Sequence, residues 1–304
     1  MGKLWPWTLP AAALLAATLL VDDRYTASLI SWIAIAAVIA SSLRFVLLIG
    51  ELNFATAAFV GIGAYAAGSA TTLFGMPFVV ALLSGGVAAT LVAVAFGAIT
   101  LRTKGPYFLL IGFAFTEIVR ILYTKSPVLG GNSGMIGIFP PRAMDDWMMP
   151  FVVLVSLALI FVLAALEKSD FGTVLTALRD NENVAVSVGL NATLIKVTCF
   201  AIASFAAGLA GSLHAFVNNV ISPGDFSFFL STFALAYVKV GGEDHILGPV
   251  AGALLLVFLG SYAVGLGAGE HMFYGAAIIL AVLLMPKGIV GTVATAARRV
   301  GRRG

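Results

Sequence analysis

The feature that most constrains this fold is a series of ten apolar segments, joined by short polar connections, that takes up most of the 304 residues. A helix that crosses the hydrocarbon core of a bilayer needs about 20 mainly apolar residues, and most of the ten segments approach that length. They lie at 4–21, 27–49, 52–74, 78–101, 107–123, 147–166, 193–217, 226–240, 247–266 and 272–285. We therefore predict an all-α, polytopic membrane protein with about ten transmembrane helices.

The composition excludes a water-soluble globular protein. Hydrophobic residues make up 61% of the chain and charged residues only 10%, whereas a soluble domain carries about 25% charged residues. The net charge of +3 does not indicate a nucleic-acid partner, because the basic residues lie at segment ends and in a tail. Cys199 is the single cysteine, and the three histidines lie far apart in the sequence. We expect no intramolecular disulfide and no metal site.

The basic residues of the connections assign the two sides of the membrane. One side receives Lys3, Arg102, Lys104, Lys168, Arg179, Lys196, Lys239, Lys287, Arg298, Arg299, Arg302 and Arg303. The other side receives Arg24, Lys125 and Arg142. Cytoplasmic loops are enriched in Lys and Arg, so both termini and the basic C-terminal tail at 287–304 are predicted to be cytoplasmic.

Three segments fit this scheme less well. Segment 52–74 begins with the polar residues Asn53 and Thr56, and segment 226–240 is short, so either could be partly re-entrant. Irregular backbone at that depth requires surrounding protein or a water-filled cavity. The first segment could instead be a signal peptide, but no small-residue cleavage site precedes Asp22, which favours a span.

Small residues recur at every fourth position of segment 193–217. They are Ala203, Ala207, Gly211 and Ala215, with a second series at Ser204, Gly208 and Ser212. Such stripes let neighbouring backbones approach closely. Together with the 33 glycines of the chain, they predict a tightly packed bundle.

One long polar segment, 167–191, separates the sixth and seventh apolar segments. Its first half carries apolar residues at helical spacing. They are Val174, Leu175 and Leu178. Asp180 or Asn181 can cap a second short helix over 182–188, and Gly189 can end it. A segment of this kind is either a docking surface for a partner in water or a solvated connection.

Short blocks along nearly the whole chain resemble the permeases of branched-chain amino-acid ABC importers, and among them the LivM-type subunit. The blocks keep their order. They are GIGAY at 61–65, GPYF at 105–108, EIVR at 117–120, GGNSGMIGI at 130–138, ALRDNE at 177–182, GLN at 189–191, AGLAGSL at 207–213, ISP at 221–223, GG at 241–242, LGP at 247–249 and MPKG at 285–288.

The resemblance implies a single transmembrane permease domain over 1–304, with a type II ABC importer fold, in the bacterial inner (plasma) membrane. A sister permease subunit would complete the path, a periplasmic solute-binding protein would deliver the solute, and two cytoplasmic ATPase subunits would use ATP and Mg. This chain lacks the Gly-x-x-x-x-Gly-Lys-Ser/Thr loop that binds phosphates. We therefore expect no catalytic residue and no cofactor bound by this chain.

The resemblance also makes 167–191 a cytoplasmic coupling loop that seats in an ATPase subunit. The residues expected to take part are Arg179, Asp180, Asn181, Glu182, Ala185 and Gly189. We expect the small Ala185 to lie close to the surface of the partner. On the periplasmic side, the glycine-rich residues Gly130, Gly131, Asn132, Ser133 and Gly134 could contact the binding protein or could simply form a turn-rich loop.

Polar residues within the apolar segments are the candidates for the solute path, because charges there are costly and therefore suspect. Asn53 and Thr56 are expected to share a helical face and to offer neutral hydrogen bonds to a zwitterion. Glu51 could contact solute, or could lie at the amino end of the third helix, where the dipole favours an acid. Glu117 and Arg120, three residues apart, can pair along one helix, either as a structural pair or in the path.

Arg44 is a further intramembrane charge. One departure from the family pattern concerns the solute. Residues 50–56 read GELNFAT, where the family commonly reads Gly-Gln-Leu-Ser-Leu-Gly-His. The sequence leaves open whether a branched-chain amino acid, urea, an amide or an aromatic acid is carried.

Two other classes remain as alternatives. A self-contained secondary transporter would show internal repeats and a coupling charge at the midplane. A channel or structural subunit would not need a capped cytoplasmic segment.

Overall fold

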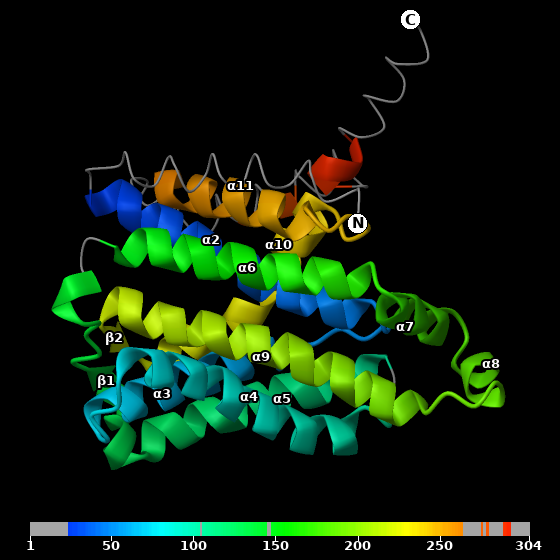
Figure 1. Cartoon of the computed structure of the whole chain (residues 1–304), viewed down its shortest axis with the longest axis horizontal. Helices are drawn as coiled ribbons and strands as arrows, with labels where there is room; N and C mark the ends of the chain where they lie inside the picture. The colour runs from blue at the N-terminus through cyan, green and yellow to red at the C-terminus, as the bar shows by residue number, and fades with distance from the viewer. Residues whose placement is uncertain are drawn as a thin grey trace, which may run out of the picture.

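The computed structural model describes residues 24–103, 105–144, 147–263, 275, 278–279 and 288–292. Within them, long helices run side by side in one bundle (Figure 1). These helices are α2 (Arg24–Leu47), α3 (Thr56–Thr72), α4 (Phe78–Thr100), α5 (Pro106–Lys125), α6 (Met148–Glu167), α9 (Ala192–Asn218), α10 (Phe228–Gly241) and α11 (Gly248–Ala263). The predicted first span, most of the predicted tenth span and most of the basic tail lie outside the described residues.

Five of these helices are long and apolar enough to cross a membrane: Tyr25–Leu47 of α2, together with α4, α5, α6 and α9. The other three are shorter, with 17 residues in α3, 14 in α10 and 16 in α11. The prediction of a helical, multi-pass membrane protein is confirmed to this extent. The described residues contain fewer than the ten predicted spans.

α9 lies in the core of the bundle and packs directly on the backbones of α3 and α4. A Cβ atom on Gly63 of α3 would lie 2.1 Å from the carbonyl oxygen of Gly208, and one on Gly208 would lie 2.7 Å from that of Gly85 in α4. A Cβ atom on Gly211 would lie 1.9 Å from the carbonyl oxygen of Val60. Since no side chain fits at these crossings, the small-residue stripes have the packing role predicted for them.

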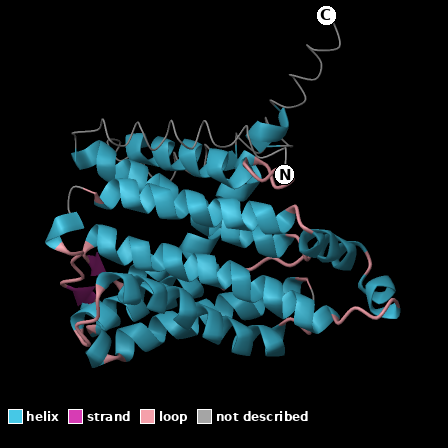
Figure 2. Ribbon diagram, in the orientation of Figure 1, coloured by secondary structure: helices cyan, strands magenta, loops and turns pink. Residues whose placement is uncertain are grey.

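The two ends of the bundle differ. At one end the short helices α7 (Asp170–Asp180) and α8 (Glu182–Ser187) project beyond the long helices, and at the other lie turns and two short strands (Figures 1 and 2). The turns are η1 (Pro127–Leu129), η2 (Gly131–Ser133) and η3 (Arg142–Met144). The basic residues of the connections predict that the α7–α8 end is cytoplasmic.

The strands β1 (Met135–Ile136) and β2 (Val220–Ile221) pair antiparallel, with Met135 opposite Ile221 and Ile136 opposite Val220. This pairing is a small departure from the predicted all-α fold. It ties the loop after α5 to the loop after α9 at the end of the bundle opposite α7 and α8 (Figure 2).

Candidate functional site

The chain between α2 and α3 is non-helical although it is buried. The carbonyl oxygen of Phe54 accepts hydrogen bonds from Thr116 Oγ1 at 3.0 Å and from Ser231 Oγ at 2.9 Å. Ser231 Oγ in turn accepts from the backbone N–H of Ala57 at 2.9 Å. Side chains of α5 and α10 therefore satisfy the backbone groups that a helix would have paired, which is the condition for irregular backbone inside a membrane protein. The amino ends of α3 and α10 meet at this break.

Asn53 and Thr56 form the break instead of a shared helical face, so that part of the prediction is wrong. Asn53 precedes α3, and its Oδ1 accepts from the N–H of Ala55 at 3.0 Å. The Thr56 hydroxyl donates to the Asn53 carbonyl oxygen at 2.9 Å. The two residues are 3% and 1% exposed. Their predicted role in the solute path stays a prediction, but here they hold the backbone turn.

Glu51 lies at a helix amino end, but the helix is α5 and not α3. Its Oε2 accepts from the N–H of Gly105 at 3.1 Å, and Gly105 is the residue that precedes α5. A carboxylate at this position complements the helix dipole. Glu51 thus has the predicted position at a helix amino end, but the helix is α5 and not α3.

Glu117 and Arg120 pair as predicted. Glu117 Oε2 lies 2.8 Å from Arg120 Nε and 2.7 Å from Arg120 Nη2, and the two side chains are 24% and 36% exposed. Ile118 and Leu122, on the same helix, are also exposed, at 57% and 60%. A partly exposed ion pair on an apolar helix is unfavourable against lipid. This side of α5 is therefore suited to contact with water or with another protein.

The glycine-rich loop at the opposite end is a defined turn. Gly130, Gly131 and Gly134 have φ angles of +81°, +56° and +76°, which favour glycine. A Cβ atom on Gly134 would lie 1.9 Å from the carbonyl oxygen of Ile221. These glycines thus bring β1 against β2, while Asn132 and Ser133 are exposed beside them.

The polar segment folds into the two short helices predicted for it. Asn181 caps α8, since its side chain accepts from the N–H of Val184 at 3.2 Å. Gly189 follows with φ +92°, and its N–H donates to the Val186 carbonyl oxygen at 3.0 Å. Leu175 and Leu178 of α7 are buried. The prediction of an amphipathic helix, a capped second helix and a closing glycine is confirmed.

Ala185 does not lie at the surface, contrary to the prediction. It is 4% exposed and packs with Leu178 and Ala192 in a small apolar cluster that joins α7 and α8 to α9. The exposed apolar residues here are valines: Val184 at 57% and Val186 at 51% in α8, and Val188 at 72% directly after it. Sequence reasoning overlooked these valines, although apolar residues in an otherwise polar segment were a signal for them.

One ion pair and one close packing contact attach the polar segment to the bundle. Glu182 pairs with the buried Lys196 of α9 at 3.1 Å. Arg179 lies against the turn after α2, where a Cβ atom on Gly50 would be 3.3 Å from Arg179 Cγ. Gly50 has φ +80°, so glycine is favoured there for its conformation as well as for space. This turn leads directly into the break before α3.

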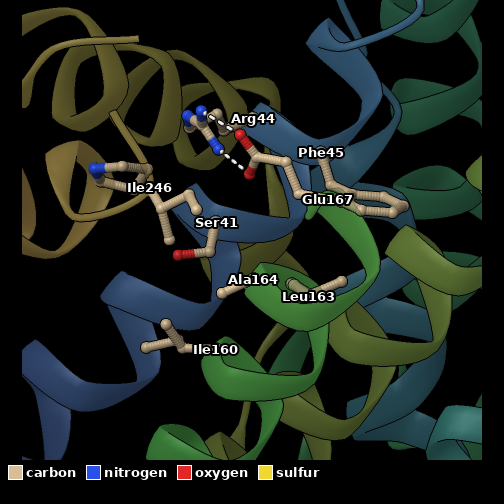
Figure 3. Close-up of a pocket in the computed structure, with 9 residues that line it drawn as sticks. Ser41, Arg44, Phe45, Ile160, Leu163, Ala164, Glu167 and Ile246 are labelled. Atoms are coloured by element: carbon tan, nitrogen blue, oxygen red, sulfur yellow. Dashed lines mark hydrogen bonds and ion pairs between the residues drawn. The ribbon is translucent and has the colours of Figure 1, made fainter. Parts of the chain in front are cut away.

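Arg44 provides a third attachment, which the sequence did not reveal. It faces Glu167, the last residue of α6, in a bidentate pair (Figure 3) with Nη1–Oε2 and Nη2–Oε1 distances of 2.5 and 2.8 Å. Its Nε donates to the carbonyl oxygen of Glu243, in the loop after α10, at 2.7 Å. The pair borders a cavity of about 10 Å³, room for roughly one water molecule. An arginine within an apolar segment signals such a partner, but not which residue it is.

A pair of buried tyrosines was also overlooked. The rings of Tyr65 on α3 and Tyr123 on α5 stack with centroids 4.0 Å apart. Both hydroxyl oxygens are buried and have no hydrogen-bond partner among the described residues. Tyr65 lies nine residues after Thr56 in α3, and its ring also packs edge-on against that of Phe226 with centroids 6.0 Å apart.

Comparison with known proteins places these features in a family. A family model described as branched-chain amino acid transport system / permease component matches residues 25–285. The high-affinity branched-chain amino acid transport system permease protein LivM of Salmonella typhimurium is 28% identical over 271 residues, which is 79% of this chain and 64% of that protein. LivM of Escherichia coli gives the same identity and coverage.

A more distant relative belongs to a second kind of permease. The probable branched-chain amino acid transport permease protein LivH of Methanocaldococcus jannaschii is 28% identical over 151 residues, 46% of each chain. The present chain spans less than two thirds of the length of the bacterial LivM proteins it matches. No solved structure matches it.

Proposed function

Because the chain belongs to the family of branched-chain amino acid transport permease components, we propose that it forms one half of the membrane path of a binding-protein-dependent ABC importer. A sister permease forms the other half, and two cytoplasmic ATPase subunits that use ATP and Mg drive transport. A solute-binding protein delivers a branched-chain amino acid or a similar small solute from the periplasm. The assembly lies in the bacterial inner membrane, and this chain is a transport subunit that binds no cofactor.

The observation that carries this proposal is the way the α7–α8 segment is built. It presents Val184, Val186 and Val188 to the surroundings while Ala185 and Leu178 hold it on the bundle. Exposed apolar residues that cluster on one short element are suited to a protein contact. We assign Val184 and Val188, one helical turn apart, to the contact with the ATPase subunit and call them the valine face.

The contacts of this segment give a route for coupling. Arg179 lies against Gly50, and Glu51 of the same turn bonds to the residue before α5. Glu167, which precedes α7, is held by Arg44 of α2. A displacement of α7 by the ATPase would therefore act on the turn before α3, on the amino end of α5 and on α2. The break before α3, where the amino end of α10 also lies, comes next along this route.

The path itself is assigned to the side of α5 that carries Glu117 and Arg120, where it faces the sister permease. The exposure of this ion pair supports the assignment. The break with Asn53 and Thr56 lies behind α5 and connects to it through Thr116. The exposed turn at Asn132 and Ser133 is proposed to meet the binding protein.

Reconstitution with omission of single components tests the proposal. Proteoliposomes that contain this chain, the sister permease, both ATPases and external binding protein should take up labelled leucine only with internal ATP. Omission of the sister permease or of the ATPases should abolish uptake. Uptake by this chain alone, driven by an ion gradient, would instead identify a secondary transporter.

A further inference from the structure

A groove is bounded by α4, α6 and α9, three of the helices that are long and apolar enough to cross a membrane. In Figure 1, α9 runs between α6 and α4. The groove has a volume of about 540 Å³. Thr90 and Val94 of α4 and Val162 and Leu166 of α6 line it. Most of the lining comes from α9, through Leu194, Val197, Thr198, Ala201, Ile202 and Phe205.

The lining of this groove offers no free polar group. Its two polar residues, Thr90 and Thr198, donate their hydroxyls to carbonyl oxygens of their own helices, at Gly86 and Leu194, both at 2.8 Å. The other lining residues are apolar. A hollow of this kind is suited to hydrocarbon and not to water or a polar solute. Three of its apolar side chains are among the exposed ones: Val94 at 41%, Val162 at 50% and Leu194 at 63%.

The groove has the length of one bilayer leaflet. From Leu194, in the first turn of α9, to Phe205 the helix rises about 16 Å. Half of a hydrocarbon core of about 30 Å is about 15 Å. Phe205 packs closely on α4, where a Cβ atom on Gly86 would lie 2.8 Å from the Phe205 Cε2 atom. The groove can therefore hold an acyl chain that enters at the α7–α8 end and stops near the middle of the bilayer.

Cationic residues follow both α4 and α6 at the α7–α8 end of the groove. Lys168 directly follows α6, Arg102 comes two residues after α4, and both are exposed. The amino end of α9, which carries the positive end of the helix dipole, lies at the same end. Of the nearby carboxylates, Glu167 is bound by Arg44, and Asp170 begins α7. Basic residues beside a gap between membrane helices are complementary to an anionic lipid head group.

We propose that this groove binds one acyl chain of an anionic phospholipid, with its phosphate near Lys168 and Arg102. The lipid belongs to the leaflet at the α7–α8 end, which is the predicted cytoplasmic leaflet. Because α6 leads into α7 and α9 follows α8, the bound lipid supports both helices from which the α7–α8 segment extends. It is a structural ligand of the permease and not its solute, so the inference goes beyond the proposed function.

Photolabelling tests where the lipid lies. The assembled complex, in bilayer nanodiscs, is irradiated with phosphatidylglycerol that carries a diazirine in one acyl chain, and labelled peptides are mapped by mass spectrometry. We expect label concentrated in 194–205 and 162–166. Unlabelled phosphatidylglycerol should suppress it at least about tenfold more effectively than zwitterionic phosphatidylethanolamine, since two cations favour the anionic head group.

Three results would overturn the proposal. Label as strong on exposed residues of α11, such as Leu254 and Phe258, would show contact with bulk lipid only. An unlabelled groove would show that polypeptide fills it. Equal suppression by the two phospholipids would show that the head group is not recognised.

A variant that fills the groove provides an independent test. Ala201 is half-buried on α9, and Ala201→Phe places a ring where the acyl chain would lie. Label in 194–205 should fall to the level on α11. The matched control is Ala95→Phe, at an exposed position of α4 outside the groove lining, which should keep the label. Added phosphatidylglycerol should raise the melting temperature of the wild type and of the control, but not of Ala201→Phe.

The head group is tested in a variant that leaves the groove intact. Lys168→Gln combined with Arg102→Gln should keep the label in 194–205 but lose the preference for phosphatidylglycerol over phosphatidylethanolamine. This variant keeps the test decisive if Ala201→Phe does not fold. If the wild-type complex transports its solute and the charge variant keeps the wild-type preference, this inference fails while the proposed function stands.

Discussion

At the residue scale, Arg44 is the side chain whose loss should remove contacts to the largest number of different elements. Its side chain is 6% exposed, and its guanidinium bonds to Glu167 of α6 (Figure 3) and to the Glu243 carbonyl oxygen beyond α10. Arg44→Met leaves Glu167 without its partner, and breaking a buried pair typically destabilises by about 3–5 kcal/mol. We expect the melting temperature of the purified complex to fall.

The double variant Arg44→Met with Glu167→Met separates a lost ion pair from lost packing. It removes both charges and should recover part of the stability that the single variant loses. Arg44→Lys keeps the charge but not the planar bidentate geometry, so it should be intermediate. A double variant no more stable than Arg44→Met would show that the ion pair is unimportant.

Thr56 gives a second prediction at this scale. Its buried hydroxyl donates to the Asn53 carbonyl oxygen, and Thr56→Val leaves that acceptor without this bond. The variant should lose about 1–3 kcal/mol of stability, seen in thermal melting. Thr56→Ser keeps the hydroxyl and should retain most of it. If the variant changed the solute preference without changing the stability, Thr56 would instead be a residue that contacts the solute.

At the scale of elements, substitutions at the neighbouring residues Val184, in the valine face, and Ala185, in the cluster beneath it, should act in different ways. Val184→Arg places charge on the exposed side of α8 and should detach the ATPases, so that uptake falls at least about tenfold while α7 and α8 stay folded. Ala185→Arg places charge in the cluster with Leu178 and Ala192. It should open the segment itself.

Limited proteolysis of the membrane part distinguishes these outcomes. Cleavage between 170 and 191 should rise for Ala185→Arg and stay at the wild-type level for Val184→Arg. Pull-down of the ATPases should fail for both variants. Normal uptake with Val184→Arg would rule out the valine face as the docking surface.

The elements also show where sequence reasoning succeeds. Helices α7 and α8 were predictable because Asn181 and Gly189 form their capping hydrogen bonds with residues only three positions away. The burial of Ala185 was not predictable, because Ala185 packs against Ala192, the first residue of a different helix, α9. The break before α3 was signalled only by polar residues, since the bonds that permit it come from Thr116 and Ser231, 62 and 177 residues from Phe54 in the sequence.

At the scale of the whole molecule, the exposed ion pair on α5 predicts which side of the bundle meets water. In a Cys199→Ala background, Glu117→Cys and Arg120→Cys should react with a membrane-impermeant thiol reagent in the assembled complex. Ile118→Cys, exposed but on another side of α5, should be protected by lipid. Protection of both positions 117 and 120 in actively transporting complex would place the path elsewhere.

The hydrogen bonds between Phe54, Ala57 and Ser231 also constrain the order in which the helices can assemble in the membrane during synthesis. With 14 residues, α10 is about 21 Å long and cannot cross a hydrocarbon core of about 30 Å alone. It can settle only against helices already in the bilayer, and Phe54 and Ala57, the hydrogen-bond partners of Ser231, are synthesised earlier. Until Ser231 emerges, the Phe54 carbonyl lacks one of its two partners. A chain that stops before α10 therefore leaves in the membrane a backbone carbonyl with one unfilled acceptor site, which Ser231 fills in the finished protein.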